Sequence, residues 1–207
     1  TITYGISGAT ATSGVSTKVG TYGTLTLTTS GSYTYKPNNL NTLTSGSYTD
    51  NFTLTSSNNG SSATTQVFTV NVTGANDAPI FTSTPVTLSY TDTIASNTFS
   101  SSTGTLSATD AEGLAVSYGI SGVTATSGSS SKVGTYGTLT LTTAGAYTYT
   151  PNNLNTLSAG SYTDTFTLTS SNNGTSGTTQ VFTVNITGAN DAPTFTSTPV
   201  TLSYTDT

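Results

Sequence analysis

Apolar side chains recur at every second position in short runs along this chain, and turn-forming residues separate the runs. Such alternation over four to eight residues is typical of a β-strand with one buried face. The positions between the apolar ones are mostly Thr and Ser, which favour strands and carry no charge. Residues 80–193 contain seven such runs, at Val86–Tyr90, Leu106–Ala108, Leu114–Ile120, Leu139–Leu141, Tyr147–Tyr149, Phe166–Leu168 and Phe182–Ile186.

Other segments interrupt the alternation and predict connections between the strands. A Gly/Ser-rich excursion covers residues 121–131, and Pro151 ends the fifth predicted strand. Residues 152–160 favour a helical turn with Leu154 and Leu157 pointing inward. The string Asn172–Gly174 predicts a tight hairpin turn, because Asn and Gly tolerate the positive φ that such turns require.

The strand pattern predicts an all-β fold. Seven short strands in about 100 residues, each with one apolar face, favour two antiparallel sheets packed face to face with Greek-key connections. The chain contains no Cys and no Trp, so the Cys…Trp…Cys pattern of antibody domains is absent. We therefore expect tandem seven-stranded Greek-key β-sandwiches of a cadherin-like or immunoglobulin-like kind.

An internal repeat defines the domain organisation. Residues 1–93 align without a gap to residues 115–207, and 77 of the 93 positions are identical. The turn-prone string Gly74–Pro79, which returns as Gly188–Pro193, is the best candidate for the boundary between repeats. We therefore expect a repeat lacking its first strands at 1–79, a complete repeat at 80–193, and the first strand of the next repeat at 194–207.

The composition removes most kinds of active site and partner. The chain has no His and no Cys, so general base catalysis by His, thiol nucleophiles and His/Cys metal sites have no residues to work with. Three Lys or Arg against eight acids give a net charge of −5, which argues against binding of nucleic acid. No apolar run is long enough to span a membrane. We therefore expect no enzyme, no nucleic-acid partner and no membrane span.

The few acids predict calcium sites where neighbouring repeats meet. All of them fall at strand ends or in loops of the predicted sandwich, and Ca²⁺ takes six to eight oxygen ligands from carboxylates, Asn and backbone carbonyls. The alternative is that these acids are solvated and keep a nearly neutral surface soluble. The complete junction would use Asp50, Asn76, Asp77, Asp110 and Glu112, and a second, incomplete junction would use Asp92, Asp164, Asn190 and Asp191.

Two strings of the sequence resemble the calcium-binding elements of cadherin-like domains. Residues 72–81 are similar to the linker between such domains, and residues 108–113 resemble their Asp-x-Asp calcium loop. A closer resemblance covers nearly the whole 114-residue repeat and is to the VCBS repeats of giant bacterial adhesins. The strings that carry it are Thr103–Asp110, Lys132–Leu141, Tyr147–Asn152 and Val184–Pro193.

The resemblance implies a cadherin-like sandwich, export by a type I system, and a place in the stalk of a cell-surface or biofilm adhesin. The sequence departs from the cadherin-like pattern at three ligand positions. Gly74 stands where the linker has its first Asp, Ala78 where it has its second Asn, and Glu112 where the loop has an Asp. Because fewer carboxylates are present, we expect few or weak calcium sites.

Two functions follow as hypotheses. The first is an extracellular spacer in a cell-adhesion protein, whose length depends on repeat number and whose junctions calcium stiffens. Its partners are the neighbouring repeats of the same chain. The alternative is a subunit of a self-assembling filament, sheath or surface layer, in which identical chains exchange strands, since uncharged Thr-rich edges offer little protection against pairing.

Overall fold

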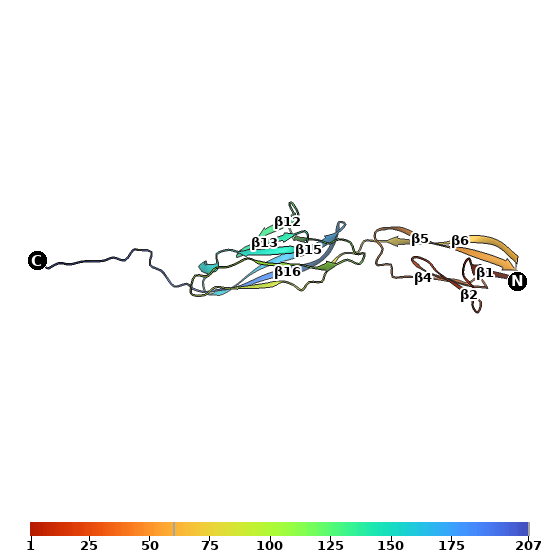
Figure 1. Ribbon diagram of the computed structural model, residues 1–207, viewed down its shortest axis with the longest axis horizontal. Coiled ribbons are helices and arrows are strands. Elements are labelled where there is room, and N and C mark those ends of the chain that lie inside the picture. The colour runs from red at the N-terminus through yellow and green to blue at the C-terminus, as the bar shows by residue number, and fades with distance from the viewer. Residues whose placement is uncertain (60, 207) are drawn as a thin grey trace. The chain divides into compact units, whose positions relative to one another are not determined.

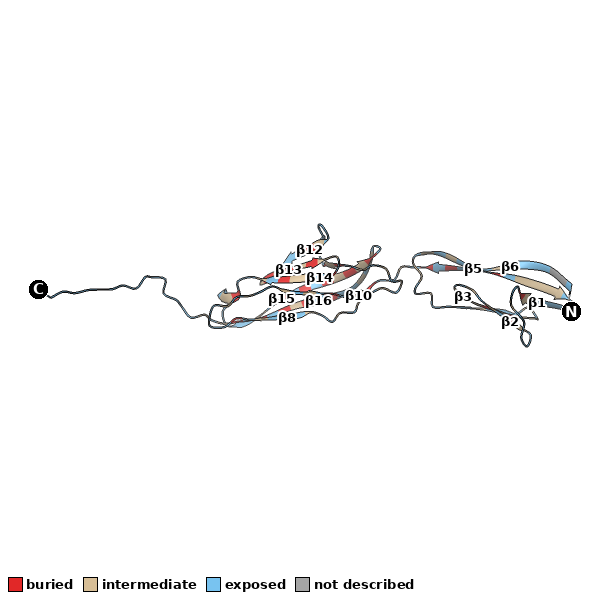
Figure 2. Ribbon diagram, in the orientation of Figure 1, coloured by how far each residue is buried: buried red, intermediate tan, exposed pale blue. Residues whose placement is uncertain are grey.

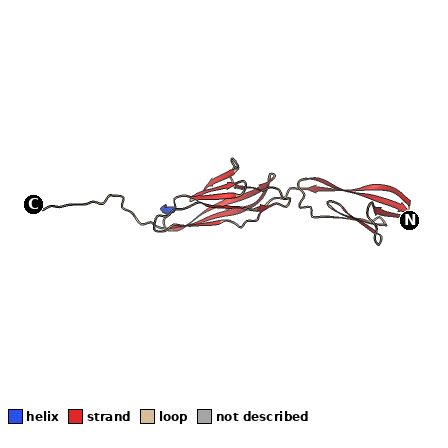
Figure 3. Ribbon diagram, in the orientation of Figure 1, coloured by secondary structure: helices blue, strands red, loops and turns tan. Residues whose placement is uncertain are grey.

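The computed structural model describes residues 1–59 and 61–206. Thr207, the last residue of the strand expected at 194–207, lies outside the described residues. Strands dominate the regular structure, and the helical turn expected after Pro151 is a 3₁₀ turn at Leu154–Thr156 (Figure 3). The chain forms two compact units. Unit 1 comprises Thr1–Pro79, Asp110–Ala115 and Asn172–Thr175, and unit 2 comprises Ile80–Thr109, Val116–Ser171 and Ser176–Thr207.

The second repeat is built from two main sheets (Figure 1). One has the strand order β11-β15-β16-β8, the other has the order β12-β13-β14-β9, and β10 and β7 form a two-stranded ribbon. The strand bounds are β7 Ile80–Phe81, β8 Thr87–Thr91, β9 Ser102–Thr105, β10 Ala108–Thr109, β11 Ser117–Ile120, β12 Ser129–Val133, β13 Gly137–Thr142, β14 Ala146–Pro151, β15 Gly160–Asn172 and β16 Thr175–Gly188.

Strand β16 pairs with a neighbour along the chain, β15, and with a remote strand, β8. Strands β15 and β16 are neighbours joined by a tight turn, in which Asn173 and Gly174 have φ values of 42° and 80°. These positive φ values confirm the hairpin that the Asn-Asn-Gly string predicts. Strand β8 pairs parallel to β16, with Thr87 opposite Thr183 and Thr91 opposite Thr187. The parallel pair places the first long strand of the repeat against its last.

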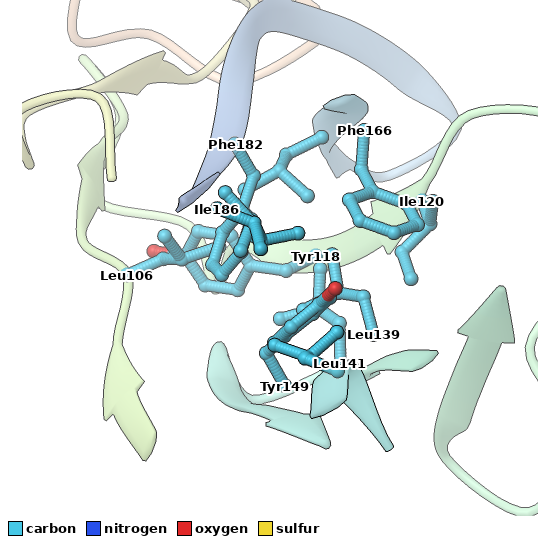
Figure 4. Packing of buried hydrophobic residues seen from close by; sticks show 12 residues of the cluster. Leu106, Tyr118, Ile120, Leu139, Leu141, Tyr149, Phe166, Phe182 and Ile186 are labelled. Atoms are coloured by element: carbon cyan, nitrogen blue, oxygen red, sulfur yellow. The ribbon is translucent and has the colours of Figure 1, made fainter. Parts of the chain in front are cut away.

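The core of unit 2 fills the space between the two sheets. Tyr149 and Phe182 have no exposed surface, and Phe166 is 2% exposed. Their rings stand edge to face or tilted, with centroids 6.2 to 6.3 Å apart, the arrangement that aromatic quadrupoles favour. Figure 4 shows Tyr149 beside Leu139 and Leu141 in the same cluster as Phe166 and Phe182, and Figure 2 shows the buried positions alternating along the strands. A sandwich without disulfides is stabilised by this burial.

Unit 1 contains two three-stranded sheets, with the orders β1-β5-β6 and β2-β3-β4. In the described part of this unit, no strand occupies the positions that β8 and β9 take in the second repeat. Only four buried residues, Ile6, Leu25, Leu27 and Phe52, make up its core cluster within the described residues. The strand bounds are β1 Ile2–Ile6, β2 Val15–Val19, β3 Gly23–Thr28, β4 Tyr33–Pro37, β5 Gly46–Asn58 and β6 Ser61–Gly74.

The structure confirms the all-β sandwich. It differs from the expected strand map in several places, including the short strand β7, which matches none of the seven expected runs. The Gly/Ser-rich excursion contains a strand, β12, whose Ser130 is buried although it is polar. The second expected strand is divided between β9 and β10, because Leu106 turns into the core between them. The third begins at Ser117, three residues later than the apolar pattern suggests. Short polar strands lack the apolar alternation by which strands are recognised in sequence.

Candidate metal centre

The linker that follows β6 carries Asn76 and Asp77, and two loops of the second repeat belong to the same unit. Asn76 donates through Nδ2 to Oδ1 of Asn172 at 3.0 Å and to the backbone oxygen of Asp77 at 3.0 Å. Asn172 in turn donates through Nδ2 to Oδ1 of Asp110. A continuous chain of hydrogen bonds therefore joins the linker, the hairpin turn and the acidic loop.

The acidic loop is shaped by a turn that starts at Asp110. The second carboxylate oxygen of Asp110, Oδ2, accepts from the backbone N–H of Leu114 at 2.9 Å. The backbone N–H of Gly113 donates to the backbone oxygen of Asp110 at 3.2 Å. Gly113 has a φ of 73°, a conformation that favours glycine. This turn brings Glu112 to the linker, where Oε1 accepts from the backbone N–H of Asp77 at 3.2 Å.

Two oxygens at this place have no hydrogen-bond partner although they are buried: Oδ1 of Asn76 and Oε2 of Glu112. A buried carboxylate or amide oxygen without a donor costs roughly 1 to 3 kcal/mol, so such atoms call for a physical explanation. Hard oxygen ligands suit Ca²⁺. Within residues 1–59 and 61–206, no three His, Cys, Asp or Glu side chains converge as a metal-binding group, so the candidate set mixes carboxylates with amides.

The structure brings four of the five residues expected at the complete junction into this part of unit 1. Asn76, Asp110 and Glu112 have intermediate burial, and Asp77 is exposed. Asn172 completes the arrangement, although the sequence pattern indicated only a turn there. It is 3% exposed and holds Asn76 and Asp110 through its amide group. Its burial follows from pairing that is remote in sequence, which an Asn-Asn-Gly string does not reveal.

Asp50, the fifth expected ligand, lies elsewhere in unit 1. It sits on β5, and its carboxylate reaches the opposite sheet, where Oδ1 accepts from Thr21 N at 2.8 Å. Oδ2 accepts from Tyr22 N at 3.0 Å and from Tyr35 Oη at 2.7 Å. Both oxygens are thus taken by protein donors, and Asp50 connects the two sheets instead of extending toward the linker. The structure thus does not bring Asp50 together with the other four expected ligands.

Asp164 repeats this arrangement in unit 2. It is 4% exposed, and its oxygens accept from Thr135 N at 2.8 Å, Tyr136 N at 2.9 Å and Tyr149 Oη at 2.9 Å. A Cβ added to Gly134 would stand 2.5 Å from Oδ2 of Asp164, so glycine is required there. Asp164 also therefore links sheets instead of joining Asn190 and Asp191.

Burial and hydrogen bonding shift the pKa values of Asp50, Tyr35 and Tyr149. Burial alone would raise the pKa of Asp50, but the hydrogen bonds from Tyr35, Tyr22 and Thr21 outweigh it and hold the pKa below its usual range. Burial and the neighbouring Asp50 raise the pKa of Tyr35 to about 12. The pKa of Tyr149 is raised for the same reasons, with burial first and Asp164 second.

Among the other residues expected at the incomplete junction, Asp92 and Asp191 each have a buried oxygen without a hydrogen-bond partner, whereas Asn190 is exposed. Asp92 is 3% exposed, and its Oδ2 accepts from Ala189 N at 3.4 Å, so it lies against the end of β16. Oδ1 of Asp92 and Oδ1 of Asp191 are both buried without a hydrogen-bond partner. Asn190 lies beside Asp191 in the chain and is exposed. Like Asn76 and Glu112, Asp92 and Asp191 each carry one buried oxygen that has no hydrogen-bond partner.

Comparisons with known proteins find matches among solved structures alone. No protein-family model matches the chain, and no curated protein matches it. Similar structures include the protocadherin gammaB4 extracellular domain (TM-score 0.41, 14% identity, 85% of this chain and 27% of that one). Others are human CDH23 EC21–23 (0.42, 17%, 90% and 62%) and Drosophila N-cadherin EC1–4 (0.42, 12%, 91% and 41%).

These values limit what the comparisons say about the chain. It spans between about a quarter and three fifths of the length of the three structures named. With identities of 12 to 17%, function and ligands do not transfer from them. The β-sandwich assignment rests on the strand pairing of the chain itself.

No helix among the described residues has the length and apolar character needed to cross a bilayer.

Proposed function

We propose that the chain is a non-enzymatic, structural module of an extracellular protein, in which tandem β-sandwiches act as spacers in the stalk of a bacterial cell-surface adhesin. The internal repeat supports this role, because near-identical tandem units add reach without adding a new site. The uncharged Thr/Ser faces and the lack of His and Cys agree with it. The resemblance to VCBS repeats is what suggests a bacterial surface or biofilm setting.

The proposal includes weak calcium binding where one repeat meets the next. The ligands are Asn76, Asp77, Asp110 and Glu112, and the observation that carries the proposal is the pair of buried oxygens without partners on Asn76 and Glu112. When bound, Ca²⁺ would neutralise the carboxylates and accept these oxygens as ligands. It would connect the linker after one repeat with two loops of the next and restrain the junction. Asp92 and Asp191 would serve the following junction in the same way.

Thermal melting of the 207-residue chain tests the calcium site. Ca²⁺ at about one hundred times its Kd stabilises the folded form by about 2.7 kcal/mol, so the transition that reports on unit 1 is expected to rise by several degrees and to return with EDTA. Terbium luminescence excited through the chain's tyrosines gives an independent readout of binding. Equal melting curves with Ca²⁺ and with EDTA would contradict the proposal.

A matched pair of variants separates a site from general charge effects. Glu112→Gln removes one negative charge at the proposed site, and Asp206→Asn removes one from an exposed residue. We expect Glu112→Gln to weaken calcium binding at least tenfold, while Asp206→Asn leaves it unchanged. Equal weakening by both would indicate that calcium merely screens the net charge.

A further inference from the structure

Each repeat has a sheet edge that carries a lysine. Strand β12 stands at one edge of the sheet β12-β13-β14-β9, and β2 holds the same place in the sheet β2-β3-β4 (Figure 1). Among the described residues, each of these two strands pairs with one other strand only. Lys132 lies in β12, and its counterpart in the repeat, Lys18, lies in β2. The chain has three Lys and Arg in total, so most of its positive side chains stand on these two edges.

The backbone groups that β12 leaves open can be assigned from its hydrogen bonds. Ser129 exchanges two backbone hydrogen bonds with Thr126 on the outer side of the strand, at 2.7 and 3.1 Å. In an antiparallel ladder, successive residues turn their N–H and C=O groups to opposite sides of the strand. Ser131 and Val133 therefore also turn these groups outward, whereas Lys132 turns its own toward β13. The open edge is thus two residues long and is centred on Lys132.

The side chain of Lys132 leaves the strand on the face that points into the sandwich. Its partner across the ladder is Leu139, which has no exposed surface, and residues that are paired across a ladder share a face. Lys132 is nevertheless exposed, and its Nζ donates to the backbone oxygen of Ser121 at 3.3 Å. Lys18 donates in the same way to the backbone oxygen of Ser7 at 2.7 Å. The ammonium group of each repeat therefore lies at the surface beside the open edge.

Two such edges can use all their open backbone groups in one antiparallel register. Ser131 of one copy must stand opposite Val133 of the other, and Val133 opposite Ser131, so that both residues of each edge exchange hydrogen bonds. The central pair of this register is Lys132 opposite Lys132, in a position without hydrogen bonds, where side chains approach one another most closely. Like charges directly opposite one another destabilise a strand pair. Pairing of β12 with β2 of another copy places Lys132 opposite Lys18, with the same result.

We propose that the β12 edge is the surface through which two copies of this chain would join, and that Lys132, with Lys18 on the β2 edge, keeps the copies apart. The rest of the edge favours pairing, because Val133 is 76% exposed and Ser131 carries no charge. A lysine on an exposed edge strand opposes such association, since pairing would bring its charge against another strand and remove water from it. This role goes beyond that of a spacer, because it determines whether neighbouring chains remain separate.

Removing both charges tests the proposal in solution. Sedimentation of the full chain at increasing concentration is expected to show that Lys18→Thr/Lys132→Thr associates about tenfold more strongly than the natural chain. Lys18→Arg/Lys132→Arg keeps the charges and is expected to behave as the natural chain does. Lys36→Thr is the control for net charge, because the second repeat has Thr150 at that place, and it is expected to have little effect. All measurements are made in EDTA, so their outcome does not depend on calcium binding.

A single cysteine tests the register directly, because the chain has no cysteine of its own. Lys132→Cys removes the charge and places two thiols in the central pair, where the Cα atoms would be about 4.5 Å apart, a separation that a disulfide accepts. Under mild oxidation, mass spectrometry of the digested dimer is expected to find residue 132 linked to residue 132. Ser131→Cys is the matched control on the same exposed strand, but it would face residue 133, so it is expected to link about tenfold more slowly.

Three results would overturn the inference. The first is that Lys18→Thr/Lys132→Thr stays as monomeric as the natural chain, and the second is that the Arg variant or Lys36→Thr associates as strongly as the Thr variant does. The third is equal linking by Lys132→Cys and Ser131→Cys, which would show collision without register. Each lysine donates one hydrogen bond to a backbone oxygen at the surface, so the variants are expected to melt within a few degrees of the natural chain.

Discussion

One buried aspartate in each unit connects the two sheets of its sandwich. Asp50 and Asp164 each accept two backbone N–H groups and one tyrosine hydroxyl from the opposite sheet. A buried carboxylate is costly unless such donors surround it. With these three donors in place, the aspartate fixes the relative position of the sheets. This contact gives a structural role to one acid of each repeat, which the sequence pattern assigned to metal binding.

The ionisation of Asp50 and Tyr35 predicts how the stability of unit 1 changes with pH. The pKa of Tyr35 is raised to about 12, above the value of about 10 for an unfolded chain. Its contribution to stability is therefore complete below about pH 10 and is lost as the pH rises toward 12. The pKa of Asp50 is lowered, so its contribution is present above about pH 4 and is lost on acidification.

Thermal melting across this range, on the chain and on Tyr35→Phe, measures the alkaline effect. The transition temperature of the natural chain is expected to fall more steeply above pH 10 than that of the variant, because Phe has no proton to lose. Parallel alkaline limbs in the two proteins would show that Tyr35 does not titrate in this range.

At the scale of single residues, the sequence predicts the chemistry of the acids but not their neighbours. Asp110 and Glu112 follow a recognisable loop pattern, and the structure places Asp110 against Asn172 and Glu112 against Asp77. Nothing in the sequence around Asp50 and Asp164 indicates that they link two sheets, since each simply stands among Thr and Tyr on a strand. Their donors come from residues about 15 to 30 positions earlier, which short-range patterns do not report.

At the scale of the element, the β15–β16 hairpin carries a turn that also supports the candidate metal centre. Asn172 precedes the two residues with positive φ, so the turn geometry fixes where its amide points. The hairpin was predictable from the Asn-Asn-Gly string, because the string itself determines a local backbone conformation. The use of Asn172 was not predictable, since its partners Asn76 and Asp110 are 96 and 62 residues away.

Replacing Asn172 with Asp is expected to raise the calcium affinity of the metal centre and to lower the stability of the calcium-free form. The new carboxylate faces Asp110 without the amide donor, which costs roughly 1 to 3 kcal/mol in EDTA. With calcium, the added negative ligand raises affinity. Melting of Asn172→Asp should therefore show a larger difference between calcium and EDTA than melting of the natural chain.

Asn173→Asp is the matched control for this prediction. It places the same charge on an exposed residue of the same turn, where Asp tolerates positive φ. A calcium response that both variants share would assign the effect to net charge in the turn.

At the scale of the whole molecule, two nearly identical sequences reach different degrees of burial. The core cluster of unit 2 has twelve buried residues, whereas that of unit 1 has four among the residues described. We expect unit 1 to unfold at a lower temperature than unit 2, with two transitions in calorimetry. Hydrogen exchange should give faster exchange for β3 than for β13, although both read Gly-Thr-Leu-Thr-Leu-Thr. A single transition with equal protection of both strands would contradict this expectation.

The order of pairing along the chain also has a consequence for folding kinetics. Strands β15 and β16 meet across a short turn, so most of their contacts close small loops. The parallel pairing of Thr87 with Thr183 closes a loop of 96 residues, which carries the largest entropic cost in the sheet. We therefore expect the hairpins to form first and β8 to join last. While a repeat is being synthesised, the edge of its final strand is open to any chemically identical segment nearby, and neighbouring repeats of one sequence compete for the same partner.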